Sequence, residues 1–153
     1  MPVAAPWNAS WSAEMGQYEV RPCRWVDGLR AIWQPHAPGD GRPIFASPHM
    51  VRQRKSVALM LCTVCGEPTQ ASDRWMFDLG RWTPHGAALV WLTTEAPVHE
   101  VCADIATKVC PHIRARGLTP RRFPLHYRTM AAMVGGDEVE KDFGLRLDET
   151  NPA

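Results

Sequence analysis

Short runs of apolar and aromatic residues, separated by turn residues, dominate the first half of the chain and are typical of β-strands. Two such runs, residues 23–26 and 29–33, flank the tight-turn signal Asp27-Gly28. We therefore expect a β-hairpin over residues 18–34. Its first strand lies at a sheet edge or a bulge, because Pro22 has no backbone N–H to donate.

A second pair of strand-like runs covers residues 74–79 and 87–93. Between them lies a loop, residues 80–86, which begins and ends with glycine and contains Pro84. This pattern predicts a second hairpin with a longer turn.

Apolar residues recur at helical spacing over residues 97–110 and form one predicted face. They are Val98, Val101, Cys102, Ile105, Val109 and Ile113. Pro97 suits the first turn of this helix, and Pro111 is expected to end it.

Other segments carry weaker signals. Ser47-Pro48 predicts a short helix through Met50, Arg54 and Val57. The apolar run over residues 57–61 also fits a buried strand, and periodicity alone does not separate the two. A short last helix is expected around residues 127–134.

Four residues have the spacing of a metal site. Cys62 and Cys65 are separated by two residues and precede Gly66, which allows a tight turn. His99 and Cys102 lie three apart on the predicted helix and therefore share a face. Zinc prefers four such tetrahedral ligands, and four protein ligands leave no open position for water. The sequence thus predicts one structural Zn²⁺ ion, the alternative being reduced core cysteines with a surface histidine.

The remaining cysteines are not expected to bind this ion. Cys110 lies eight positions after Cys102, which is ~12 Å along an intact helix. It is interpreted as a buried thiol at a helix end, and Cys23 as a small core residue. The string Cys110-Pro111-His112 leaves a haem or a second metal as a further alternative.

The order of a Cys-x2-Cys knuckle, a hairpin and a helix with His-x2-Cys resembles the treble-clef zinc finger. The resemblance covers roughly residues 58–113 and depends on Cys62, Cys65, His99 and Cys102. It implies an α+β fold: a small treble-clef-like zinc domain, here with an N-terminal β-hairpin and extended termini. Small zinc-binding proteins of uncharacterised function, including phage-encoded ones, look similar at this level.

The length of 153 residues and the 45% of hydrophobic residues fit one domain with a real core. We expect an irregular arm over residues 1–17, a single zinc-organised domain over 18–134 and a mobile acidic tail over 135–153. No run of residues is apolar and long enough to span a bilayer, and the N-terminus lacks a secretory signal. These features predict a cytoplasmic protein with reduced thiols.

The net charge is only +1, but the charges are unevenly distributed. Residues 41–66 and 105–136 contain basic residues and no acid. These segments predict a nucleic-acid-binding module, since Arg and Lys neutralise phosphates and aromatic residues stack on bases. The candidate contacts are Arg52, Arg54, Lys55, Arg114, Arg116, Arg121, Arg122 and Arg128.

Two other functions remain open. One is a protein-interaction or assembly module, in which the Pro/Trp-rich arm docks on another chain. The other is a treble-clef nuclease, for which His85 is the only hairpin histidine. It lacks the accompanying residues of that pattern, so no catalytic residue is assigned. His36, His49 and His126 are interpreted as surface residues without carboxylate partners.

Overall fold

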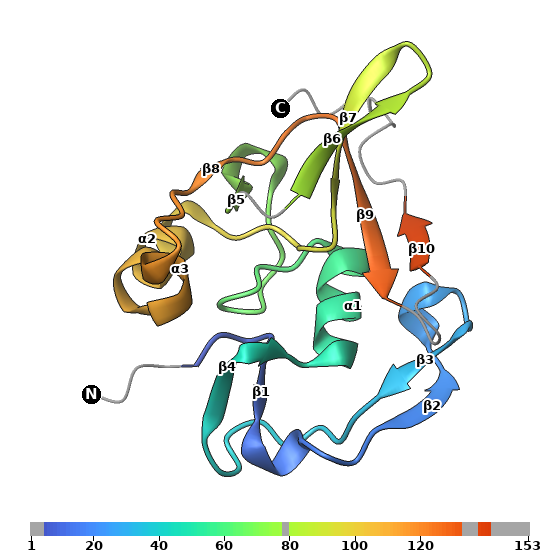
Figure 1. Cartoon of the computed structure of the whole chain (residues 1–153), viewed down its shortest axis with the longest axis vertical. Coiled ribbons are helices and arrows are strands. Elements are labelled where there is room, and N and C mark those ends of the chain that lie inside the picture. Colours follow the sequence, from blue (N-terminus) through green and yellow to red (C-terminus); the bar gives the residue numbers. More distant parts are fainter. Residues whose placement is uncertain (1–4, 78–79, 133–137, 142–153) are drawn as a thin grey trace.

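The computed structural model describes residues 5–77, 80–132 and 138–141. Three α-helices and ten strands occur there, joined by one-turn 3₁₀ helices (Figure 1). The elements are β1 (Ala9–Trp11), η1 (Ser12–Glu14), β2 (Glu19–Pro22), η2 (Arg24–Val26), β3 (Arg30–Trp33), β4 (Pro43–Pro48), α1 (Met50–Leu59), η3 (Ala71–Asp73), β5 (Trp75–Met76), β6 (Gly80–His85), β7 (Ala88–Thr93), α2 (Glu100–Val109), α3 (Pro111–Ala115), β8 (Arg121–Arg122), β9 (Tyr127–Ala132) and β10 (Glu138–Lys141).

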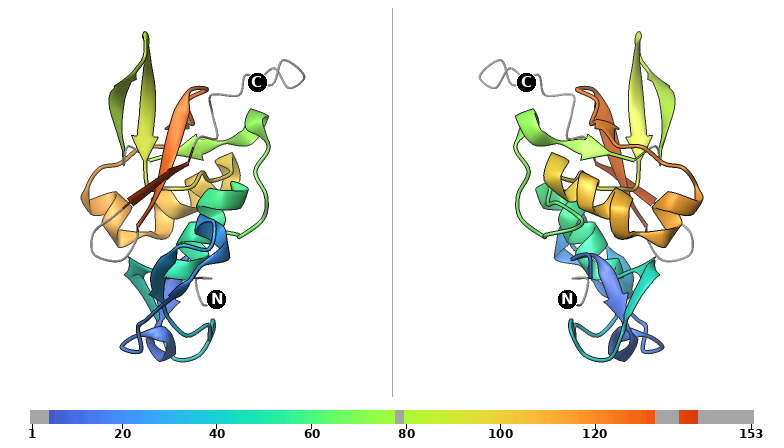
Figure 2. Two further views of the ribbon diagram at one scale, coloured as in Figure 1. Left: turned by 90° about the vertical axis from the view of Figure 1, so that its right-hand side faces the viewer. Right: turned by 90° about the vertical axis from the view of Figure 1, so that its left-hand side faces the viewer.

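The predicted α+β class is confirmed. The largest sheet has the strand order β10-β9-β7-β6, and three two-stranded sheets pair β1 with β4, β2 with β3 and β5 with β8. All described pairs are antiparallel except β7 with β9. The hairpin of β6 and β7 projects from the rest of the molecule (Figure 2).

The first predicted hairpin is present as β2 and β3, but its turn is longer than the sequence indicated. Strand pairing ends at Pro22 and Arg30. The connection contains η2 and is closed by a hydrogen bond from the Cys23 N–H to the Leu29 carbonyl. Asp27 (φ 59°) and Gly28 (φ 78°) both adopt left-handed conformations, as their turn signal indicated.

The second predicted hairpin has its second strand in the predicted place, but its first strand is wrong. The partner of β7 is β6, which covers residues 80–85, whereas β5 pairs with β8. Prolines are rare inside sheets, and Pro84 misleadingly marked this strand as a loop. It is tolerated because β6 is an edge strand of its sheet.

Residues 127–132 form a strand and not the expected last helix. β9 lies parallel to β7, with Trp91 opposite Tyr127 and Thr93 opposite Thr129. Tyr127 and Thr129 are both buried in this position. Long-range pairing therefore decides the conformation of a segment whose local pattern is ambiguous.

The helix α2 confirms the predicted helix over residues 97–110, but only part of its predicted apolar face is buried: Val98 is 4% exposed and Cys102 packs against the same cluster. Val101, Ile105 and Val109 are exposed, while Ala103 and Ala106 are buried. Both the exposed set and the buried alanines recur with the period of a helix. The periodicity alone therefore does not show which side of α2 packs against the rest of the protein. Small alanines allow close packing on the side that carries Cys102.

Residues 5–17, part of the predicted irregular arm, contain one strand and one 3₁₀ helix. β1 pairs with β4, the indole of Trp7 donates to the Ser56 hydroxyl at 3.0 Å, and Glu14 is fully buried. Most of the predicted acidic tail lies outside the described residues, and its described part is β10. The division into arm, domain and tail stays a prediction. Among the described residues, no helix has the length and apolar character needed to cross a membrane.

Candidate metal centre

A tight turn after α1 positions the first pair of metal-ligating residues. The helix ends at Met60, whose left-handed φ of 52° redirects the chain. The Cys62 N–H then donates to the Glu67 carbonyl, and the Gly66 N–H donates to the Cys62 carbonyl, each at 2.8 Å. These two bonds fold residues 62–67 into a loop that turns both thiols toward one point.

Gly66 is required in this loop for two reasons. Its φ of +79° lies in the left-handed region, which residues other than glycine rarely adopt. A Cβ at this position would also lie 2.8 Å from the ring of Trp7, which packs over the loop. Trp7 is held there because its backbone N–H donates to the Val64 carbonyl at 2.8 Å.

The start of α2 positions the second pair. His99 is the residue that precedes the helix, and Cys102 lies in its first turn. Two backbone hydrogen bonds between Trp75 and Val98, at 2.8 and 2.9 Å, fix the chain as it enters the helix. The Asp73 carboxylate accepts the Glu100 N–H at 2.9 Å and so caps the first turn.

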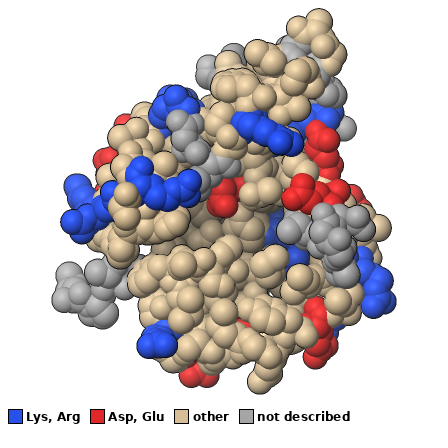
Figure 3. Space-filling model, in the orientation of Figure 1, with Lys and Arg blue, Asp and Glu red and all other residues tan. Residues whose placement is uncertain are grey.

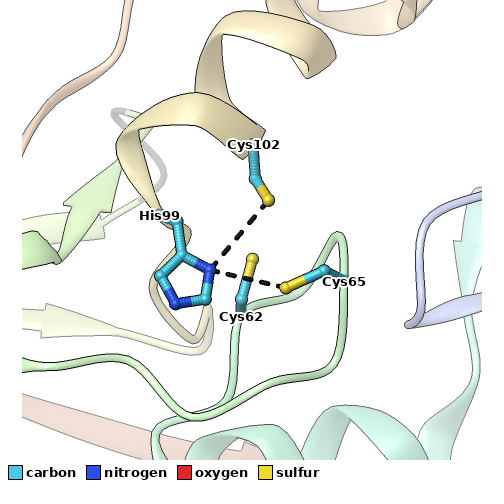
Figure 4. A group of neighbouring side chains, drawn as sticks. All are labelled: Cys62, Cys65, His99 and Cys102. Carbon is cyan, nitrogen blue, oxygen red and sulfur yellow. Dashed lines mark hydrogen bonds between the residues drawn. The ribbon is translucent and has the colours of Figure 1, made fainter.

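All four predicted ligands converge on one point (Figure 4). Their ligand atoms lie within 4.8 Å of one another. His99 Nδ1 is 3.4 Å from Cys65 Sγ and 4.0 Å from Cys102 Sγ. Tetrahedral zinc with ordinary bond lengths separates nitrogen and sulfur ligands by about 3.5 Å. The cluster therefore fits a metal ion of zinc's size and ligand preference.

The imidazole of His99 is oriented for metal binding through Nδ1. Its other nitrogen, Nε2, is 3.1 Å from the Pro68 carbonyl, which can only accept a hydrogen bond. Nε2 therefore carries the proton, and the lone pair of Nδ1 points at the thiols. A hydrogen bond of this kind, from the second ring nitrogen to a backbone carbonyl, is usual for metal-bound histidines.

The pKa values of the three thiols depend on burial, on backbone N–H groups and on one another. Burial raises the pKa of Cys62, but hydrogen bonds from backbone N–H groups, including those of Cys65 and His99, lower it more. Burial and the negative charge of Cys62 raise the pKa of Cys65, and together with the charge of Cys65 they raise that of Cys102 to about 12. Without a cation, the raised pKa values favour Cys65 and Cys102 as neutral thiols, whereas a bound divalent cation would stabilise all three groups as thiolates and release their protons.

Cys110 does not belong to the cluster, as the sequence predicted. It follows the last residue of α2 and is half-buried. Cys23 is buried beside Val26 and Ala31, which confirms it as a core residue.

Glu14, His36 and His49 form a second group of close ligand atoms, but this group is occupied by protein contacts. Both oxygens of Glu14 accept hydrogen bonds from Arg52, at 2.7 and 2.8 Å. His49 was predicted to lie at the surface, but it is only 1% exposed. Its Nδ1 accepts a hydrogen bond from the backbone N–H of Arg52, and its Nε2 donates to the Pro35 carbonyl. A buried guanidinium cation at the centre excludes a second cation, so the group is structural.

Replacing Gly66 by alanine tests the geometry of the first pair. We expect Gly66→Ala to destabilise the fold by about 3 kcal/mol, because a left-handed φ and an overlap with Trp7 both oppose a Cβ. It is also expected to weaken metal affinity. Gly117→Ala is the matched control, since Gly117 has a φ of +61° and no atom within 4 Å of a Cβ. Equal losses of melting temperature in the two variants would argue against the contact with Trp7.

The predicted basic contacts of the first segment are largely wrong. Arg52 and Arg54 are each 2% exposed. Arg52 is bound by Glu14, and Arg54 donates to the Ile32 carbonyl. Lys55 is half-buried, with its ammonium group 5.5 Å from the ring centre of Trp7. These side chains stabilise the interior and do not form a basic surface.

The second basic segment behaves differently. Arg128 is half-buried and forms an ion pair with Glu140 of β10, so its charge is compensated. The other four predicted contacts are exposed: one lies on α3, one directly follows α3, and two lie on β8. They are Arg114, Arg116, Arg121 and Arg122. Lys and Arg side chains gather over this part of the molecule in Figure 3.

The sequence did not single out one exposed aromatic residue next to this basic region. Trp82 lies on β6 and is 54% exposed. Its position inside the segment interpreted as a loop concealed the alternation of the strand, which would have placed it opposite Trp91. The chain was compared with families of proteins, with curated proteins and with solved structures, and no match was found.

Proposed function

We propose that this protein is a nucleic-acid-binding module whose fold is stabilised by one structural zinc ion. The convergence of Cys62, Cys65, His99 and Cys102 carries the proposal. Four protein ligands complete a tetrahedral sphere and leave no position for a catalytic water. The proposed ion therefore stabilises the fold and takes no part in catalysis. The treble-clef arrangement inferred from the sequence is part of this proposal.

The exposed arginines between α2 and β9 support nucleic acid as the partner. Guanidinium groups neutralise phosphates and make two hydrogen bonds to them at once. Of the eight predicted basic contacts, these four remain exposed: Arg114 lies on α3, Arg116 directly follows it, and Arg121 and Arg122 lie on β8. The arginines of the first segment take no part in the proposed surface.

A protein-interaction or assembly module is the second candidate. It is favoured by the apolar stripe on α2, where Val101, Ile105 and Val109 are 69%, 46% and 41% exposed. A stripe of this kind on a short helix is typical of a contact surface. The nuclease alternative gains no such observation.

Binding of oligonucleotides at different salt concentrations tests the proposal. We expect the zinc-loaded protein to bind a labelled single-stranded oligonucleotide at low salt. Its affinity should fall with a slope of about −2 to −3 in the logarithm of the association constant against log salt, from about 0.7 per neutralised phosphate. The variant Arg114→Gln/Arg116→Gln should reduce the slope, whereas Arg30→Gln, an exposed arginine of β3, should not.

An absence of binding at low salt would refute nucleic acid as the partner. If the same protein has the mass of a dimer by light scattering and dissociates on Ile105→Asp substitution, the assembly module becomes the better reading. One equivalent of zinc in the purified protein is required by both candidates.

A further inference from the structure

A groove of about 480 Å³ lies between the β6–β7 hairpin and the chain that leads from β8 to β9. The lining residues are Met76, Trp82, Arg121, Arg122, Pro124, Leu125 and His126. None of these described residues is acidic. The groove opens beside the arginines of β8, so an inference about its ligand depends on the proposed nucleic-acid function.

One wall of the groove is a tryptophan ring held in a fixed position. Trp82 is 54% exposed, yet its ring packs edge-on against that of Trp91, with 5.4 Å between ring centres. The two residues are directly opposite each other in the pairing of β6 with β7. Because Trp91 is 4% exposed and part of the core, it anchors the exposed ring.

The opposite wall is also fixed. Phe123 and Tyr127 are buried on either side of residues 124–126, and their rings pack edge-on with 4.7 Å between centres. The His126 carbonyl accepts a hydrogen bond from the backbone N–H of Trp91 at 3.0 Å, which connects this wall to β7, the strand that pairs with β6. Leu125 is 65% exposed in the segment between the two anchors.

Positive charge lies at one end of the groove. Arg121 and Arg122 are held by the pairing of β8 with β5. The guanidinium of Arg122 donates to the Ser72 carbonyl at 2.5 Å and lies 5.4 Å from the ring centre of Trp75. An apolar floor with a flat ring and a cationic end is complementary to a base attached to a phosphate.

We propose that this groove binds an unpaired nucleotide of a single strand, with its base against Trp82 and its phosphate near Arg121 and Arg122. A paired base in a duplex has both faces covered by its neighbours, so it cannot reach a ring that lines a recess. An acidic peptide matches the arginines but has no flat group for the indole. At about 480 Å³, the groove lies within the usual range of small-molecule sites, about 300–1,000 Å³, which suits a single nucleotide.

Binding of zinc-loaded full-length protein to a labelled ten-nucleotide oligothymidine, and to a duplex of equal length, tests this site. We expect Trp82→Ala to weaken binding of the single strand by about tenfold or more, since one stacked base contributes that much. Trp82→Phe should retain most of the affinity. Phe45→Ala is the control, because Phe45 is an aromatic residue of similar exposure, 44%, on β4.

The outcomes separate the groove from the wider proposal. If Trp82→Ala binds the single strand as the unchanged protein does, while Arg121→Gln/Arg122→Gln binds it weakly, the groove inference fails and the basic surface stands. If the unchanged protein binds neither oligonucleotide at low salt, both fail. Equal competition by polyglutamate, unaffected by Trp82→Ala, would identify an acidic protein segment as the ligand instead.

Discussion

Removal of the metal ion is expected to unfold the region between residue 58 and residue 113. The buried cluster around the site is small, with Cys62, Val98 and Ala103 at its centre, and one of these is itself a ligand. A structural zinc site contributes roughly 10–16 kcal/mol of apparent binding free energy at neutral pH, against about 5–15 kcal/mol for the net stability of a whole domain. Apolar packing of this size does not replace such a contribution.

Cys65→Ser is the most informative variant for this prediction. Cys65 is exposed, so serine leaves no cavity and the loss reflects coordination alone. We expect the variant to purify without stoichiometric zinc, and its near-ultraviolet circular dichroism to lose the tryptophan signal. The unchanged protein with a strong chelator should show the same loss.

Cys110→Ser is the matched control, since Cys110 lies at the other end of α2 and outside the cluster. It should keep its zinc and its spectrum. Replacing zinc by Co²⁺ should give the absorption of a tetrahedral thiolate complex in the control and not in Cys65→Ser. A metal-free protein with an unchanged melting temperature would contradict the role assigned to the site.

The metal ligands could be predicted from the sequence because both pairs depend on local geometry. In each pair the two members are three positions apart, within a turn for Cys62 and Cys65 and on a helix for His99 and Cys102, and this spacing fixes how they face each other. That the two pairs meet is a long-range fact, and it followed only from zinc's need for four ligands. The protonated nitrogen of His99 depends on the Pro68 carbonyl and had no signal in the sequence.

The basic residues could not be sorted from the sequence, because charge alone does not reveal a distant partner. Arg52 is neutralised by Glu14, which lies 38 positions earlier in the chain. The first strand of the second hairpin was assigned to the wrong residues for a related reason, since a proline signals a loop unless the strand lies at an edge. In both cases, tertiary pairing overrides a correct local rule.

The buried pair of Glu14 and Arg52 provides the other large expected effect. The two side chains are 0% and 3% exposed, and Arg52 also donates to the Ala9 carbonyl. Removing one partner leaves the other charge buried and unpaired, which costs roughly 3–5 kcal/mol. We therefore expect Glu14→Gln to lower the free energy of unfolding by that amount near neutral pH.

The same pair predicts a pH dependence. Burial raises the pKa of Glu14, but the hydrogen bonds from Arg52 and from the backbone N–H groups of Trp11 and Ala37, with the charge of Arg52, outweigh it. The pKa consequently falls from 4.5 to about 2. Above pH 4.5 the carboxylate is charged in both folded and unfolded chains, and its stabilisation is complete. Between pH 4.5 and pH 2 the unfolded chain binds a proton that the folded chain does not, so about 3 kcal/mol is lost as the pH falls.

Denaturant unfolding of the unchanged protein and of Glu14→Gln, at a fixed zinc concentration from pH 7 to pH 3, measures this effect. Loss of zinc in acid affects both proteins, so the difference between their unfolding free energies isolates Glu14. That difference should stay constant down to about pH 5 and then shrink. Glu19→Gln is the control, because Glu19 pairs with Arg21 at the surface, where both side chains are about half exposed. Its effect should stay within about 0.5 kcal/mol at every pH. A difference between the unchanged protein and Glu14→Gln that is constant from pH 7 to pH 3 would show that the carboxyl group of Glu14 is not held ionised by Arg52.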